Sequence, residues 1–154
     1  MRAIDGVNNL KKLRGVLADR PSVVADAVAL RSGPIIERCS VVETDFFESV
    51  PGGADGYLMK HIVHDWNDED ALKILRNCRR AIQPDGRLLL VEVVLKGSNE
   101  PDPGKALDLH MLVLFKGRER TEADLGVLLS EAGFSLMRVI PTSGPISILE
   151  SRPT

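Results

Sequence analysis

Apolar runs separated by polar breaks dominate the first sixty residues. Three of them, Arg14–Ala18, Cys39–Thr44 and Ala54–His61, are rich in aliphatic or β-branched side chains. Acidic residues, prolines and glycines bound these runs, which is typical of buried strands. Between the first two, Ser22–Leu30 has helical composition, and we expect Ser22 to be its N-cap.

The hydrophobic period changes at Asn67. From there to Ile82 apolar residues recur at helical spacing, and lysine and arginine side chains occupy the opposite face. Asn67 or Asp65 can cap this helix, while Pro84-Asp85-Gly86 ends it. We therefore expect an amphipathic helix here.

The next run, Arg87–Leu95, is apolar almost throughout and includes one acid, Glu92. A run of this kind is expected of a parallel strand covered on both faces. Two helices should follow, over Lys105–Phe115 and Thr121–Ala132. The second has stronger signals, because its first residue is an N-cap threonine and Gly133 stands where a helix C-terminus favours glycine.

The chain ends in two further apolar runs, Ser135–Thr142 and Pro145–Ser151, joined by a short turn that predicts an antiparallel hairpin. Strands alternating with helices predict an α/β sandwich with a mostly parallel sheet. A length of 154 residues suits a single domain over residues 1–154.

Charge and composition exclude several classes of protein. The formal net charge of −2 gives no electrostatic footprint for nucleic acid or an anionic membrane. No apolar run approaches the roughly 18–20 residues of a membrane span, and the first residues lack a signal peptide's apolar core. We therefore expect a cytoplasmic protein. Cys39 and Cys78 lie far apart without His/Cys clustering, so neither a disulfide framework nor a metal site is predicted.

The segment Lys60–Asp68, KHIVHDWND, joins a strand to a helix and contains two histidines. Ligands of open α/β sheets bind outside the carboxyl ends of the strands, so a histidine there is well placed for chemistry. His64 is our candidate catalytic base, although a single histidine is more often a hydrogen-bonded residue without a catalytic role.

Three segments resemble the catalytic half of an S-adenosylmethionine-dependent O-methyltransferase, of the family that methylates plant phenolics, hydroxyindoles and bacterial polyketides. They are Gly15–Val24, Glu37–Leu95 and Asp108–Phe134, in family order and spacing. The resemblance implies a Rossmann-like methyltransferase sandwich. It also implies methyl transfer from S-adenosylmethionine to a hydroxyl of a small aromatic or polyketide-like acceptor, leaving S-adenosylhomocysteine.

The same resemblance implies which residues hold the cofactor. Asp19 would accept hydrogen bonds from the ribose hydroxyls, since a carboxylate can accept from two neighbouring hydroxyls. Asp45 and Phe46 would hold the adenine, through its amino group and its ring face. Lys60 matches a family lysine near the cofactor, but a solvated lysine at a strand end explains it nearly as well.

His64 matches the family base that takes the acceptor's hydroxyl proton, and Glu92 and Glu119 match the two acids that flank and orient it. Three residues are candidates for acceptor contact: Asp65, His110 and Met111. Helix capping explains Asp65 equally well. Core packing is an equal alternative for the other two.

Two parts of the family pattern are missing. Nothing matches the glycine-rich cofactor loop; its nearest remnant, Ala3–Asn9, stands too close to the next strand for a parallel crossover. We expect the first strand and this loop to be missing or remodelled. The family's N-terminal dimerisation domain is also absent, so we expect a partial catalytic domain that is truncated at its N-terminus. We separately expect the chain to form a homodimer. The alternative is an inactive fragment or pseudoenzyme that acts as an oligomerising or binding module. A nucleotide-binding module of another Rossmann type is disfavoured, because GxGxxG is absent.

Overall fold

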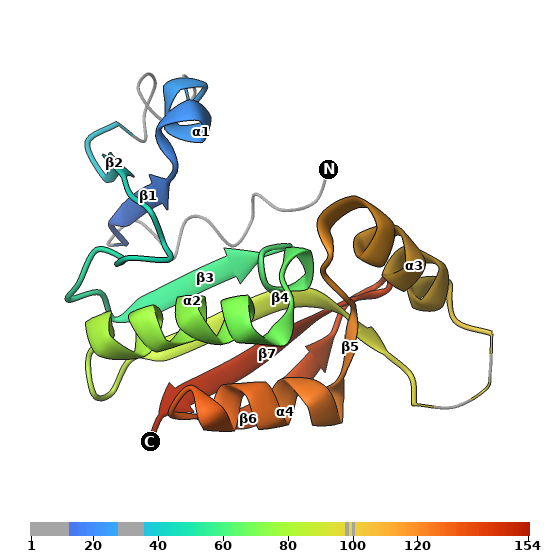
Figure 1. The fold of residues 1–154 in the computed structure, drawn as a ribbon. Coiled ribbons are helices and arrows are strands. Elements are labelled where there is room, and N and C mark those ends of the chain that lie inside the picture. The colour runs from blue at the N-terminus through green and yellow to red at the C-terminus, as the bar shows by residue number, and fades with distance from the viewer. Residues whose placement is uncertain (1–12, 28–35, 98, 100) are drawn as a thin grey trace. The chain divides into compact units, whose positions relative to one another are not determined.

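The computed structural model describes residues 13–27, 36–97, 99 and 101–154, which divide between two compact units at 1–46 and 47–154 (Figure 1). The first unit contains β1 (Gly15–Asp19), α1 (Pro21–Ala25) and β2 (Cys39–Glu43). The two strands are parallel, and Asp19 pairs with Glu43 at their carboxyl ends. Both predicted strands are confirmed to within one residue at each end.

The start of α1 differs from the prediction. Pro21 is the first helical residue and Arg20 is the N-cap, without a side-chain hydrogen bond, so Ser22 is not a cap. Proline suits the first turn because its missing N–H has no helical partner there and its φ is already helical. The regular helix ends at Ala25, and residues 28–30 of the predicted helix lie outside the described residues.

The second unit carries the remaining elements. In chain order they are β3 (Gly56–Lys60), the 3-10 helix η3 (Val63–Asp65), α2 (Asp68–Ala81), β4 (Arg87–Leu95), α3 (Pro103–Phe115), β5 (Arg120–Thr121), α4 (Glu122–Glu131), β6 (Phe134–Pro141) and β7 (Ile146–Pro153).

The sheet of this unit has the strand order β3-β4-β7-β6, with β5 paired to the end of β4. β3 and β5 run parallel to β4, whereas β7 runs antiparallel to β4 and β6 antiparallel to β7. The predicted C-terminal hairpin is therefore confirmed, and it makes the sheet mixed. The pattern of apolar runs did not reveal β5, which is two residues long, or η3.

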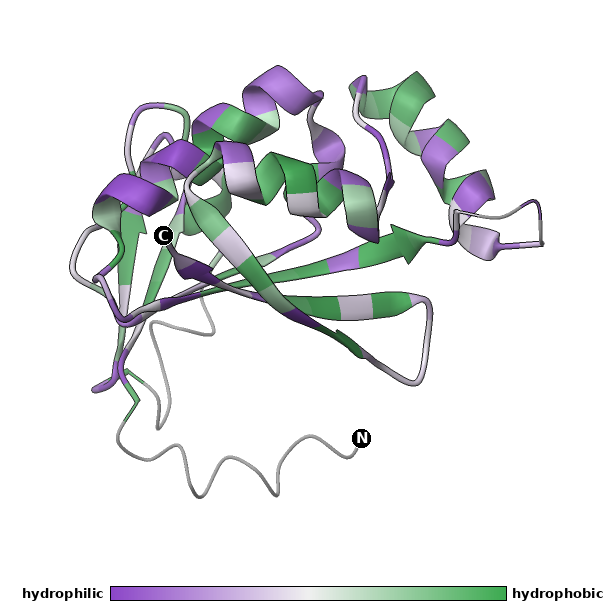
Figure 2. Ribbon diagram, turned by 90° about the horizontal axis from the view of Figure 1, so that it is seen from below, coloured by the Kyte–Doolittle hydropathy of each residue, from purple (hydrophilic) through white to green (hydrophobic). Residues whose placement is uncertain are grey.

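The core lies between this sheet and two helices. Figures 1 and 2 show α2 and α4 side by side over one face of the sheet. Fully buried side chains from each layer meet there, among them Leu75, Leu90, Leu129, Phe134 and Leu149. Burying aliphatic and aromatic side chains of this size supplies about 1.5–3 kcal/mol each, so this layer is the main source of the unit's stability.

In the middle of β4, residues 88–92 alternate between complete and partial burial. Leu88, Leu90 and Glu92 are buried, while Leu89 and Val91 are half-buried. The face toward α2 and α4 is covered as predicted, whereas the opposite face is only half-buried, so the predicted cover on both faces is confirmed in part. Glu92 continues the row of Leu88 and Leu90, because side chains two residues apart share a face.

Local signals fix the ends of the two core helices. Asn67 caps α2 by accepting from the Asp70 N–H, and Thr121 caps α4 in a capping box with Asp124. Gly133 follows α4 with φ of 84°, a left-handed conformation that glycine adopts without strain. These caps are confirmed as predicted.

No helix in the described part of the chain is long and apolar enough to cross a membrane. The glycine-loop remnant predicted at residues 3–9 lies outside the described residues.

Candidate active site

His64 lies in η3, directly after the carboxyl end of β3. The connection is tight: His61 has φ of 54°, and its N–H donates to the Val91 carbonyl at 3.1 Å. A left-handed conformation is uncommon for a residue other than glycine. It turns the chain back toward β4, so that His64 lies beside an acid of that strand, Glu92.

Three carboxylates surround the imidazole of His64, which is 9% exposed. Glu119 Oε1 lies 2.9 Å from Nδ1, Glu92 Oε2 lies 3.8 Å from Nδ1, and Asp65 Oδ1 lies 3.3 Å from Nε2. Because a carboxylate can only accept, the short contact to Glu119 places the proton of the neutral ring on Nδ1. The lone pair of the neutral ring is then on Nε2.

These acids determine the pKa of His64. Burial lowers it, but the hydrogen bond to Glu119 and the charges of Glu92, Glu119 and Asp65 together outweigh burial and raise it above its ordinary value. The protonated imidazole is therefore stabilised, which strengthens this side chain as a base.

From within the sheet, Glu92 also binds the backbone of residues 61–67 between β3 and α2, which we call the histidine loop. It is 2% exposed, and its Oε1 accepts from the N–H groups of Ile62 and Val63 at 3.2 and 3.0 Å. Its Oε2 is buried without a hydrogen-bond partner among the described residues. Burial raises the pKa of Glu92 to about 7, against the opposing effects of His64 and the two N–H donors.

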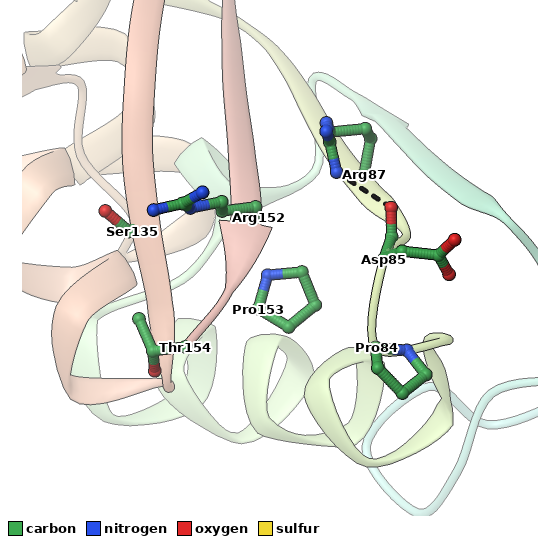
Figure 3. Close-up of a pocket in the computed structure, with 7 residues that line it drawn as sticks. All are labelled: Pro84, Asp85, Arg87, Ser135, Arg152, Pro153 and Thr154. Atoms are coloured by element: carbon green, nitrogen blue, oxygen red, sulfur yellow. Dashed lines mark hydrogen bonds between the residues drawn. The ribbon is translucent and has the colours of Figure 1, made fainter.

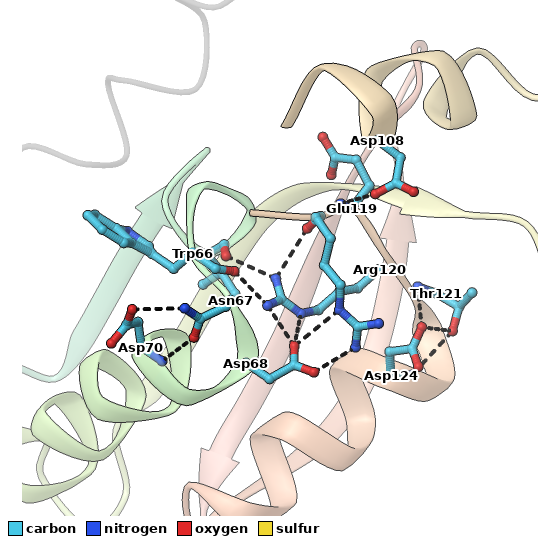
Figure 4. A network of polar contacts seen from close by, with 11 residues as sticks. Trp66, Asn67, Asp68, Asp70, Asp108, Glu119, Arg120, Thr121 and Asp124 are labelled. Atoms are coloured by element: carbon cyan, nitrogen blue, oxygen red, sulfur yellow. Dashed lines mark hydrogen bonds and ion pairs between the residues drawn. The ribbon is translucent and has the colours of Figure 1, made fainter. Parts of the chain in front are cut away.

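A buried arginine, Arg120, binds the backbone on the other side of the histidine loop. Arg120, 2% exposed, donates to the carbonyls of Val63 and Trp66 at 2.9 and 2.8 Å and to Asp68 Oδ1 at 2.8 and 3.0 Å (Figure 4). A planar guanidinium can satisfy several acceptors at fixed angles. Burial raises the pKa of Asp68, but Arg120 and Arg118 lower it more, so the net shift is downward.

The turn after α3 packs directly against the histidine loop. A Cβ on Gly117 would lie 2.0 Å from the His64 carbonyl oxygen, so this position requires glycine. Two residues on, the Glu119 N–H donates to Asp108 Oδ1 at 2.8 Å. These contacts place the Glu119 carboxylate at His64 Nδ1.

The second unit brings together four of the predicted residues: His64, Glu92, Glu119 and Asp65. Sequence reasoning missed Arg120 and Gly117. Their roles depend on carbonyls more than fifty residues earlier in the chain, and no local pattern signals such contacts. One indication of Arg120 was present in the sequence: it stands next to Glu119, which has an arginine on each side.

The predicted acceptor residues on α3 differ in their surroundings. His110 is exposed, and its Nδ1 donates to the Ala106 carbonyl at 2.7 Å, whereas Met111 is 8% exposed. Lys60, at the end of β3, is exposed. Their predicted roles stay predictions.

The predicted cofactor residues Asp19, Asp45 and Phe46 belong to the first unit. Asp19 ends β1 and is half-buried, and its Oδ1 accepts from the Arg20 N–H at 2.7 Å. Asp45 and Phe46 follow β2, and the Arg20 guanidinium lies 5.9 Å from the centre of the Phe46 ring. Since β1 and β2 are parallel, both acids lie at the same edge of that sheet.

The second unit also has a hollow away from His64. A depression of about 480 Å³ opens between the α2–β4 turn and the end of β7, where Asp85, Arg87, Arg152 and Thr154 line it (Figure 3). Arg87 begins β4, whereas Glu92 lies five residues along it, roughly 16 Å away at strand spacing. This depression is therefore at the opposite end of the strands from His64.

Comparison with known proteins identifies the family. A model described as O-methyltransferase domain matches residues 7–135. The chain is 46% identical over 141 residues to a phenazine O-methyltransferase of Lysobacter antibioticus, a match that covers 91% of this chain and 41% of that protein. The chain thus spans about two fifths of the length of the curated relatives it matches.

Solved structures support the same family. The crystal structure of LaPhzM superimposes with a TM-score of 0.90 at 43% identity, covering 97% of this chain and 46% of that one. An O-methyltransferase of neocarzinostatin biosynthesis, in complex with S-adenosylmethionine and 2-hydroxy-5-methyl naphthoic acid, superimposes with a TM-score of 0.85 at 31% identity, covering 96% and 44%. The predicted α/β methyltransferase fold is confirmed. This chain belongs to the O-methyltransferase domain family.

Proposed function

We propose that this chain is the catalytic part of an enzyme that transfers a methyl group from S-adenosylmethionine to a hydroxyl of a small aromatic or polyketide-like molecule. The observation that carries the proposal is the 2.9 Å contact between His64 Nδ1 and Glu119 Oε1 at the carboxyl end of β3. Relatives named as small-molecule O-methyltransferases support the reaction class.

His64 acts as the general base. With its Nδ1 proton held by Glu119, the ring accepts the acceptor's hydroxyl proton at Nε2, beside Asp65 Oδ1. Glu119 and Glu92 are positioning residues: they orient the ring and stabilise the imidazolium that forms. A phenolic hydroxyl with a pKa near 10 needs only moderate assistance from such a base.

The cofactor assignments are proposals of the same kind. S-adenosylmethionine supplies, when bound, a methyl group on a cationic sulfur, which the deprotonated oxygen of the acceptor takes. Asp19 fits the ribose, because one carboxylate oxygen accepts from Arg20 and a carboxylate has further acceptor sites for hydroxyl groups. Asp45 and Phe46 would hold the adenine, and Lys60 would lie near the cofactor.

Acceptor contact is proposed for Asp65, His110 and Met111. Asp65 has the most direct support, since its carboxylate reaches the same nitrogen that takes the proton. The acceptor's identity would also depend on parts of the relatives that this chain does not match. We further propose a homodimer in the cytoplasm, in keeping with the sequence predictions.

The alternative function is a non-catalytic module of the same family. The observation that favours it is the exposed apolar surface of α3, where Leu109, Leu112, Val113 and Leu114 are each more than 60% exposed. Apolar side chains gathered in this way mark interaction surfaces.

One experiment separates the two functions. The purified chain is titrated with S-adenosylhomocysteine in a calorimeter, then incubated with S-adenosylmethionine and 2-hydroxy-5-methyl naphthoic acid, and the products are analysed by mass spectrometry. Cofactor binding and a methylated product support the enzyme. A dimer by light scattering, with neither binding nor product, supports the non-catalytic module.

A further inference from the structure

A second histidine faces the same acids as His64 but has no part in the proposed reaction. The rings of His61 and His64 stack with their centres 5.1 Å apart and 29° between their planes. Glu92 Oε2 lies between them, 4.0 Å from His61 Nδ1 and 3.8 Å from His64 Nδ1. Both His61 Nδ1 and Glu92 Oε2 are buried without a hydrogen-bond partner in the described part of the molecule.

We propose that His61, His64 and Glu92 form a binding site for a divalent transition-metal ion, with Zn²⁺ as the representative cation. Each residue offers one ligand atom, and these three atoms lie within 4.8 Å of one another. Two imidazole nitrogens and a carboxylate oxygen are a frequent protein ligand set for zinc.

An ion would draw the three ligand atoms together, by up to about 1.4 Å from the 4.8 Å within which they now lie. Ligand bonds of about 2.0–2.1 Å in a tetrahedral arrangement place the ligand atoms roughly 3.4 Å apart. The two contacts of Glu92 at 3.8 and 4.0 Å therefore close by about half an ångström. The site lies near the surface on the His61 side, since the His61 side chain is 34% exposed although its Nδ1 is buried, whereas the Glu92 side chain is 3% exposed.

The surroundings of His64 already match those of a metal-bound imidazole. A histidine that binds a metal through one nitrogen usually donates its other N–H to a carboxylate. Asp65 Oδ1 lies 3.3 Å from Nε2 and can accept that proton when Nδ1 binds the metal. Glu92 stays anchored through Oε1 by two N–H groups, which leaves Oε2 for the ion.

Metal binding and base catalysis then exclude each other. The ion takes the place of the Nδ1 proton that Glu119 accepts, and the proton on Nε2 prevents that nitrogen from accepting another. Zn²⁺ should therefore inhibit methyl transfer. This consequence rests on the proposed function, whereas the binding itself does not.

The sequence predicted no metal site, since it shows no His/Cys cluster. The fold creates one: β4 lies parallel to β3, and the left-handed backbone at His61 turns its ring toward Glu92, which is 31 positions later in the chain.

The test is calorimetric titration of the whole chain with ZnCl₂. His61→Asn removes one ligand and keeps a residue that tolerates positive φ, while His110→Asn removes the exposed histidine of α3 as a matched control. We expect one ion per chain in the wild type, at least about tenfold weaker binding in His61→Asn and no change in His110→Asn. Equal affinities in the wild type and His61→Asn would overturn the proposal.

Circular dichroism and a thermal melt confirm that His61→Asn is folded. If it is not, the wild type decides by NMR: Zn²⁺ should shift the ring signals of His61 and His64 and leave those of His110 in place, and the reverse pattern contradicts the site. Where the chain proves active, Zn²⁺ should inhibit the wild type and spare His61→Asn. Inhibition of both to the same extent would contradict the proposed competition for His64.

Discussion

Replacing Glu92 by glutamine should make the protein more stable at high pH, although it removes a charged residue next to His64. The glutamine amide keeps an oxygen that can accept from the N–H groups of Ile62 and Val63. It resembles the protonated form of Glu92, which the buried site favours. The substitution therefore tests whether burial of this carboxyl controls the pH dependence of folding.

The magnitude follows from the shift in the pKa of Glu92, from 4.5 to about 7. A rise of about 2.5 pKa units corresponds to about 3 kcal/mol of folding free energy. Because the folded pKa is the higher one, this stabilisation is complete below pH 4.5 and is lost as the pH rises through 7. The raised pKa of His64 acts in the same direction, and its contribution is lost above 6.5.

Urea unfolding of the wild type and Glu92→Gln, followed by circular dichroism at pH 5, 6, 7 and 8, measures the effect. Glu92→Gln should exceed the wild type by less than about 1 kcal/mol at pH 5 and gain further as the pH rises, to about 3 kcal/mol at pH 8. Asp68 does not interfere, since its pKa is shifted downward from 3.8. Glu131→Gln, an exposed carboxyl at the end of α4, is the control. Parallel stability curves for the wild type and Glu92→Gln over this range would refute the reasoning.

Three further substitutions test the support of the histidine loop. Arg120→Lys should lower stability by roughly 2 kcal/mol in urea unfolding, because one ammonium cannot donate to the Val63 and Trp66 carbonyls together. An unchanged urea midpoint would contradict this role of Arg120. Gly117→Ala should lower stability by about 1–3 kcal/mol and slow methyl transfer, because its Cβ would displace the His64 carbonyl. Full methyl-transfer activity would contradict close packing of residue 117 against His64. Thr121→Ala should cost about 1 kcal/mol through loss of the α4 cap, without a change in the rate of transfer.

The sequence predicted best the features that depend on neighbouring residues. The caps at Asn67 and Thr121 and the glycine after α4 follow from local hydrogen bonds and local backbone geometry. The apolar run of β4 was likewise predicted with its full bounds. The start of α1 was misjudged because two local signals competed there, and Pro21 at the first position prevailed over Ser22 as a cap.

The site was predictable only in part. Glu92 and Glu119 were named through family resemblance, since nothing in their local pattern links residues so distant in the chain to His64. The roles of Arg120 and His61 could not be predicted from the sequence. The role of Arg120 depends on carbonyls in a distant loop, and that of His61 depends on a left-handed backbone angle. Long-range contacts of this kind become visible only in the folded chain.

The most direct test of the account is single-turnover methyl transfer by the wild type and His64→Gln, measured beside S-adenosylhomocysteine affinity. We predict that His64→Gln loses roughly 10²–10⁴-fold in transfer rate, the usual contribution of a general base, while cofactor affinity stays within about twofold. The wild-type rate should rise with pH through a pKa above 6.5, and this dependence should vanish in the variant. Equal transfer by the two proteins, or loss of cofactor affinity together with transfer, would contradict His64 as the base.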